Sequence, residues 1–295
     1  MPITDKSAHL GIVRSTTRTK AKNETIEQNI TKATSYSLMS IGLHANSGLD
    51  PTTAIAIIRC YILPTLTYGL EMLQPRPQNM NKLEQFLKAL LKRILSLPPN
   101  APDPALYIIS GLLPVQAQID IKCLTLFNNI CRQNDDTLEK RLAFRQLNMK
   151  ENDSTSWFNL IKQILLKYGL QHPLEYLSNP MCKLGWKKLI QTQINEYWKS
   201  RLISDCELYS SLKYLDYSSF TPNRCHWIIH IDNESNPSRE AMLIATKLKL
   251  ATGSYILQQK RAKFVHNEKP TCKLCDTEDE DAEHFILRCV LYGTP

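Results

Sequence analysis

Residues 80–96 read MNKLEQFLKALLKRILS, and this stretch decides the fold class. Its apolar residues recur at steps of three and four, so on a helix they form one stripe. The stripe consists of Leu83, Phe86, Leu87, Leu90, Leu91, Ile94 and Leu95. Because a wide apolar stripe must be covered by other elements, the stretch predicts a helix packed into a core.

The segments on either side predict a mainly α-helical chain. Only nine glycines occur among 295 residues, which disfavours a barrel or sandwich rich in tight turns. Asp50-Pro51 is typical of a helix start, and Pro64 should kink or split the helix that follows. Further helices are expected over 20–43, 103–110, 114–133, 136–147, 155–168, 181–202, 206–214 and 238–265, the last broken near Gly253.

Three segments need a different interpretation. The apolar run at 9–13 predicts an edge strand, and residues 216–237 predict a connector with a strand-like run at 227–229. The span 51–70 carries one charge, Arg59, which at mid-membrane would cost about 2.5–3.5 kcal/mol. We therefore expect a buried helix there and no membrane span.

The charge distribution favours a polyanionic partner. The formal net charge is +8, yet residues 276–283 contain six acids and no base, and without them the charge is +14. Such a surplus suits phosphate neutralisation, although a solvated basic surface is the alternative. The candidate nucleic-acid contacts are Lys247, Lys249, Lys260, Arg261 and Lys263.

The cysteines indicate a reducing compartment. Six of the nine are scattered singly through expected helices, which does not resemble a secreted disulfide framework. No N-terminal secretory signal is visible. We expect an intracellular protein, in the cytoplasm or the nucleus.

The strongest motif lies near the C-terminus. Cys272 and Cys275 are separated by two residues, eight residues lead to His284, and four more lead to Cys289. This spacing places two thiolates on one turn and completes four ligands, which predicts one structural zinc ion with no open position for water. Thiolate-rich ligation disfavours magnesium and calcium. The alternative is three ordinary cysteines beside a chance histidine.

No complete catalytic centre is recognisable. The sequence lacks a Gly-rich phosphate loop, a Gly-x-Ser-x-Gly motif and a His-Glu-x-x-His motif. We therefore predict no catalytic residues, no small-molecule substrate and zinc as the sole cofactor.

The order of several motifs resembles the C-terminal part of non-LTR (LINE-type, jockey-like) retrotransposon reverse transcriptases. The matching segments are His9-Leu10-Gly11-Ile12, Leu63-Pro64 with Tyr68-Gly69 and Glu71, Leu97-Pro98, Pro104 to Tyr107, Gly111 with Leu113-Pro114, Leu248 to Leu250 with Gly253, and the Cys/His segment with Glu280-Asp281. The resemblance covers both ends and much of residues 1–115, but little of 116–235.

The resemblance implies four regions. Residues 1–14 would be a remnant of the polymerase palm, 15–100 a thumb-like helical region, 101–235 a helical connecting region, and 236–295 a basic helix plus a CCHC zinc module. Polymerase chemistry needs a Tyr/Phe-x-Asp-Asp hairpin for two metal ions, which the sequence lacks. The resemblance would place that hairpin before Met1, and six residues after Cys289 leave no room for a following endonuclease.

The sequence thus predicts a helical bundle, further helices and a small C-terminal zinc module. Its expected role is non-catalytic: to hold template RNA or target DNA beside the polymerase domain of the parent polyprotein. A helical protein-interaction scaffold with a structural zinc site is the alternative of a different class.

Overall fold

The computed structural model describes residues 6–9, 12–15, 17–41, 49–73, 75–149, 154–230 and 237–291. Within these ranges the chain is mainly α-helical, as predicted. None of the helices described is both long and apolar enough to cross a membrane. Two short strands, β1 (Lys6–His9) and β2 (Ile12–Ser15), form an antiparallel hairpin. The predicted single strand over 9–13 is therefore wrong, and Leu10 and Gly11 between the strands lie outside the described residues.

The main helices follow in chain order. They are α1 (Arg18–Ile41), α2 (Pro51–Ile57), α3 (Leu63–Leu66), α4 (Leu70–Leu73), α5 (Pro77–Ile94), α6 (Asp103–Ser110), α7 (Val115–Cys131), α8 (Leu138–Met149), α9 (Trp157–Lys167), α10 (Pro173–Ser178), α11 (Lys183–Glu207), α12 (Pro237–Ala251) and α13 (Gln258–Arg261). The π-helical segments are η1 (Ile58–Ile62) and η4 (His284–Arg288), and the 3-10 turns are η2 (Ser210–Leu212) and η3 (Trp227–Ile229).

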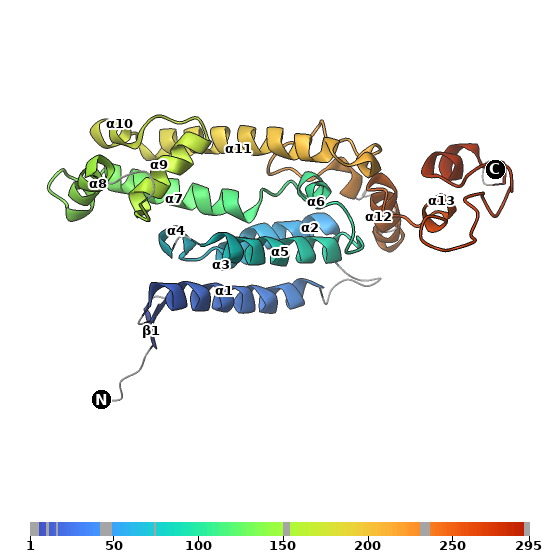
Figure 1. The fold of residues 1–295 in the computed structure, drawn as a ribbon, viewed down its shortest axis with the longest axis horizontal. Helices are drawn as coiled ribbons and strands as arrows, with labels where there is room; N and C mark the ends of the chain where they lie inside the picture. Colours follow the sequence, from blue (N-terminus) through green and yellow to red (C-terminus); the bar gives the residue numbers. More distant parts are fainter. Residues whose placement is uncertain are drawn as a thin grey trace.

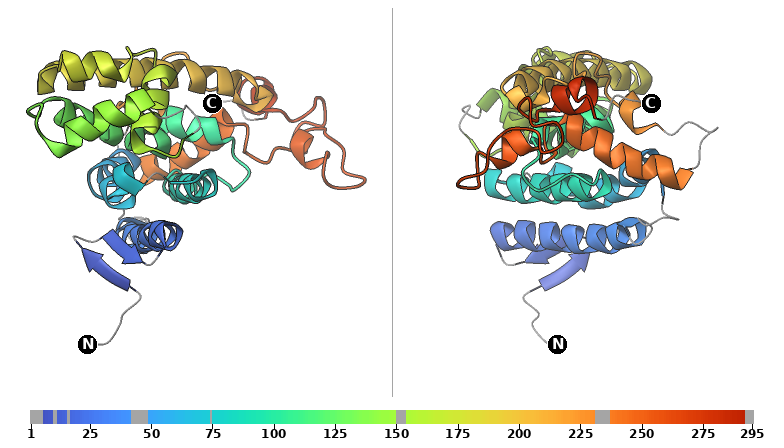
Figure 2. Two further views of the ribbon diagram at one scale, coloured as in Figure 1. Left: turned by 60° about the vertical axis from the view of Figure 1, so that its left-hand side comes forward. Right: turned by 90° about the vertical axis from the view of Figure 1, so that its right-hand side faces the viewer.

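The helices stack in layers (Figure 1), and the layers cross, because α1 and α5 are seen nearly end-on in the left view of Figure 2 whereas α11 runs across it. An outer layer is α1, with the hairpin at its edge, and α5 lies in the next layer with α2 and α3 (Figure 2). The central helix is α7, which contacts α4 and α5 on one side and α9 and α11 on the other. Because it is covered on several sides, α7 is apolar around most of its circumference, from Val115 to Phe127.

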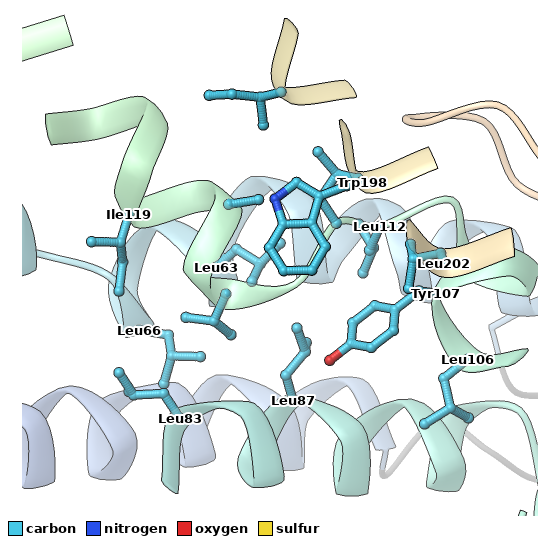
Figure 3. Close-up of a cluster of buried hydrophobic side chains, with 14 of the residues drawn as sticks. Leu63, Leu66, Leu83, Leu87, Leu106, Tyr107, Leu112, Ile119, Trp198 and Leu202 are labelled. Atoms are coloured by element: carbon cyan, nitrogen blue, oxygen red, sulfur yellow. The ribbon is translucent and has the colours of Figure 1, made fainter. Parts of the chain in front are cut away.

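The core is one continuous set of buried apolar side chains from Ile26 to Ala251. The predicted stripe of α5 is confirmed, since Leu83, Leu87 and Leu91 are fully buried. Figure 3 shows how side chains of α3, α5, α6, α7 and α11 converge, with the Trp198 ring of α11 among them. The thumb-like and connecting regions expected from the sequence therefore share one core.

Pro64 acts as predicted. The helix that begins at Pro51 changes to the π-helical η1 and resumes as α3, with Pro64 in the first turn of α3. Proline lacks the N–H that an α-helix interior would use, so the local change in winding accommodates it. Asp50 caps the start of this helix, because its carboxylate accepts from the Thr53 N–H at 3.0 Å.

Two sequence predictions fail between residues 170 and 230, and one helix there was not predicted. The helix expected over 181–202 is α11, which continues to Glu207, and the helix expected over 206–214 does not form, because Ser210–Leu212 makes only the 3-10 turn η2. The strand-like run at 227–229 is the 3-10 turn η3, because His226 Nδ1 accepts from the Ile228 N–H and caps it. The short helix α10 was not predicted, although Pro173 at its first turn is a recognisable start signal.

A buried polar network ties the central helix to its neighbours. Asp120 of α7 is 1% exposed and accepts from Lys167 Nζ of α9 at 2.9 Å and from the Tyr168 hydroxyl at 2.6 Å. Gln116 Nε2 donates to the other carboxylate oxygen at 2.6 Å. Trp198 of α11 completes the network by donating to the Tyr168 oxygen at 3.1 Å. Burial and the Asp120 charge raise the pKa of Tyr168, so its hydroxyl stays protonated and donates.

Candidate metal centre and the basic segment before it

The C-terminal segment lies at one end of the molecule, beyond α12 and outside the helical stack (Figure 1). From residue 262 to residue 291 only Cys272, His284 and Cys289 are buried. A segment of this size has no apolar core of its own, so hydrophobic burial cannot account for its fold. Its interior consists of groups that bind metals.

The first ligand pair lies on a tight turn. Thr271 bridges Asp279 in antiparallel fashion, and the Cys272 N–H donates to the Glu278 carbonyl at 2.8 Å. The Asp276 N–H then donates back to the Cys272 carbonyl at 2.9 Å, with Asp276 in the left-handed region at φ 53°. This turn brings the Cys272 and Cys275 side chains to the same side, as the two-residue spacing predicted.

The second ligand pair lies on η4. Asp281 caps its start, since Oδ1 accepts from the His284 N–H at 2.7 Å. The Cys289 N–H closes the far end by donating to the His284 carbonyl at 2.8 Å. The five-residue separation thus forms one π-type turn rather than an α-helical one, and both side chains point to the same interior.

The four predicted ligands come together. One ligand atom from each of Cys272, Cys275, His284 and Cys289 lies within 4.8 Å of all the others. Cys272 Sγ is 4.0 Å from Cys289 Sγ, and Cys275 Sγ is 3.3 Å from His284 Nε2. Ligands of a tetrahedral ion at about 2.0–2.3 Å would lie roughly 3.5–3.8 Å apart. The cluster can therefore hold one metal ion with little adjustment.

Two neighbouring side chains prepare the ligands for a metal. Glu278 Oε2 lies 3.2 Å from His284 Nδ1, so a proton on Nδ1 leaves Nε2 free to coordinate. The Thr277 hydroxyl donates to Cys275 Sγ at 3.1 Å. This hydrogen bond, with the Thr277 N–H, lowers the pKa of the Cys275 thiol to about 6, which favours the thiolate that metals bind.

The role of Glu278 gives a first prediction. Glu278→Ala removes the acceptor that orients His284, and we expect metal affinity to fall by about ten- to a hundredfold. The matched control is Glu283→Ala, which removes the same charge from the same acidic run but has no hydrogen bond to a ligand among the described residues. Competition with a chromophoric chelator measures both. An equal loss of metal affinity in the two variants would show that Glu278 acts only through its negative charge and not through its hydrogen bond to His284.

The five candidate phosphate contacts differ in what they already touch. Lys260 Nζ donates to the Gly253 carbonyl at 2.7 Å, and Arg261 Nε pairs with Glu268 at 2.9 Å. Lys247 and Lys263 are exposed and Lys249 is half-buried, and these three form no ion pair with any residue that the structure describes. The sequence grouped all five, and the structure leaves Lys247, Lys249 and Lys263 available to a partner.

Comparisons with protein-family models, with curated proteins and with solved structures find no match to this chain.

The supporting roles of Glu278 and Thr277 were not predicted. Glu278 belonged to an acidic run that was interpreted by charge alone, although a carboxylate six residues before a ligand histidine was a usable signal.

Proposed function

We propose that this chain binds nucleic acid through the lysines that precede a zinc-stabilised C-terminal module. It would do so as a non-catalytic part of a non-LTR retrotransposon reverse transcriptase. The observation that carries the proposal is that Lys247, Lys249 and Lys263, in the chain segment before the candidate metal ligands, form no ion pair in the described structure. Several unpaired ammonium groups can neutralise several phosphates at once.

The metal in this proposal is zinc. Three thiolates and one imidazole favour zinc over magnesium or calcium, which prefer oxygen ligands. Four protein ligands leave no position for an activated water, so the ion would stabilise the module and not catalyse a reaction. The ion's role would be to fix the position of the acidic run 276–283 relative to the basic segment, residues 247–263.

The motif order supports the wider role. Without the Asp-Asp hairpin of a polymerase, this chain would not extend a primer, and it would act by holding template RNA or target DNA for another domain. Phosphate contacts carry no sequence information, so binding would be non-specific, with Kd on the order of 10⁻⁴–10⁻⁶ M at physiological salt.

The test removes the three available lysines. The variant with Lys247→Gln, Lys249→Gln and Lys263→Gln should bind labelled DNA or RNA more weakly than the parent in fluorescence anisotropy. The logarithm of affinity should fall less steeply with the logarithm of salt, by about two to three units, because each lost contact on a duplex contributes about 0.9.

The control separates local contact from total charge. Lys183, Lys187 and Lys188 are exposed on α11, and replacing all three by glutamine removes the same charge from another surface. This control should bind almost as the parent does. If both triple variants lose affinity equally, the basic segment has no special role. If the parent shows no salt-dependent binding, the proposal is wrong.

The scaffold alternative has one observation in its favour. The metal module exposes large apolar side chains on η4 and just after it, with Ile286 at 57%, Leu287 at 77% and Val290 at 67% exposure. Large exposed apolar patches can mark sites of protein–protein interaction. If the protein does not bind nucleic acid, this apolar surface favours the protein-interaction scaffold as its function.

A further inference from the structure

A cleft of about 500 Å³ separates the metal module from the chain that follows α11. Lys213 and Tyr214 line one wall, and Lys263 and Phe264 after α13 line another. The two sides are held by a close backbone approach, because a Cβ on Gly253, at φ 59°, would lie 2.7 Å from the Ser211 carbonyl oxygen. The backbone of the cleft is therefore fixed at this point, between Gly253 and Ser211.

The acidic and basic side chains that line this cleft differ in their hydrogen bonds. Two carboxylates line it, but Glu280 Oε2 accepts from the Gln258 N–H at 3.0 Å and Asp281 Oδ1 from the His284 N–H at 2.7 Å. Lys260 uses one of its three donors on Gly253. Lys213 lies over the Tyr214 ring at 4.4 Å, and Lys263 forms no ion pair within the described ranges. Each acid accepts a hydrogen bond from a backbone N–H and keeps its charge, and Lys213 lies within electrostatic reach of Asp281. Each lysine still has N–H donors left for an external anion.

Aromatic rings alternate with these lysines. Tyr214 is 44% exposed and Phe264 is 80% exposed, which is unusual for a side chain of that size. Tyr255, also in the cleft, is backed by Phe285 with ring centroids 6.2 Å apart and nearly parallel planes. Exposed rings such as Tyr214 and Phe264 offer flat surfaces to a planar ligand, and neighbouring ammonium groups can meet its phosphate.

We propose that this cleft binds unpaired nucleotides of single-stranded nucleic acid, with a base against Tyr214 and Phe264 and phosphates at Lys213 and Lys263. The inference rests on the proposed function and adds the strandedness and the place of binding. A base in a duplex is stacked between its neighbours, so it cannot reach a ring inside a cleft. A duplex would therefore bind only through lysines outside the cleft, such as Lys247 and Lys249.

The experiment compares one oligonucleotide as a single strand and as a duplex, using labelled strands of about ten nucleotides. The double variant Tyr214→Leu, Phe264→Leu keeps apolar surface and removes both rings. We expect its affinity for the single strand to fall by about tenfold or more, with duplex affinity unchanged. The control is Tyr61→Leu, which removes a 61% exposed ring on η1 and should change neither affinity.

The outcomes are distinct. Unaltered metal content and helical circular dichroism must accompany the double variant, so that a lost fold is not mistaken for a lost contact. Equal affinity of the parent for single strand and duplex, or an unchanged single-strand affinity in the double variant, overturns this inference while the proposed function stands. No binding of either form by the parent overturns both.

Discussion

Replacing Asp120 by alanine is expected to lower the free energy of unfolding by about 3–5 kcal/mol. Asp120 is buried in α7 and is the shared acceptor for Lys167, Tyr168 and Gln116. Its loss leaves a partly buried ammonium without a counter-charge and a buried hydroxyl without an acceptor. Breaking a buried pair costs far more than breaking an exposed one, because the remaining charge cannot recover its water.

The control is an ion pair on the surface. Lys82 Nζ lies 2.8 Å from Glu27, with both side chains more than half exposed at 56% and 58%. Glu27→Ala should cost less than about 1 kcal/mol. Urea unfolding followed by circular dichroism measures both variants. A loss below about 1 kcal/mol for Asp120→Ala would show that the network is solvated and does not hold α7, α9 and α11 together.

Most helices could be predicted because their signals are local. The stripe of α5, the Asp50-Pro51 start and the change in helical winding before Pro64 depend on residues within a few positions of one another. The break at Gly253 also appears as predicted, since α12 ends at Ala251 and Gly253 adopts φ 59°. Local chemistry decides such features, and tertiary contacts only select among them.

The features that the sequence did not predict depend on contacts between residues far apart in the chain. Residues 203–205 were expected to separate two helices, yet α11 continues through them, with Leu202 and Cys206 on either side both buried in the core. Trp227-Ile228-Ile229 has strand composition but no strand beside it in the described structure, and a histidine cap winds it into a turn. The Asp120 network joins residues 47 and 48 positions apart, which no local pattern reveals.

The candidate site shows the same division. The four candidate ligands could be predicted as a cluster because metal-binding turns impose fixed spacings, and the structure brings all four together. Charge marks the basic residues as a group of candidates, but it does not show which of them already have partners within the chain. Lys260 and Arg261 find partners at Gly253 and Glu268, and those partners depend on how the chain turns after α12.

The second large effect concerns the metal ligands. Cys275→Ser should unfold residues 270–289 while the helices of the stack remain. The buried side chains of this module are the ligands themselves, so without metal no apolar core replaces the lost bonds. Apparent binding free energies of structural zinc sites are about 10–16 kcal/mol, which makes metal binding and folding one event.

Amide hydrogen exchange measures this effect by region. Residues of the module should lose protection in Cys275→Ser, whereas α5, α7 and α11 should keep theirs. Cys60→Ser is the control, because Cys60 is an exposed cysteine on η1, far from the cluster in the chain. Retained protection over 270–289 in the Cys275 variant would mean that the module folds without its ligands.

The most direct measurement is the metal itself, in protein purified without chelator. Elemental analysis should find one zinc ion per chain, and X-ray absorption at the zinc edge should find three sulfur ligands and one nitrogen ligand at about 2.3 and 2.0 Å. Less than about half an equivalent of zinc, or a first shell dominated by oxygen, would contradict a structural zinc centre formed by Cys272, Cys275, His284 and Cys289.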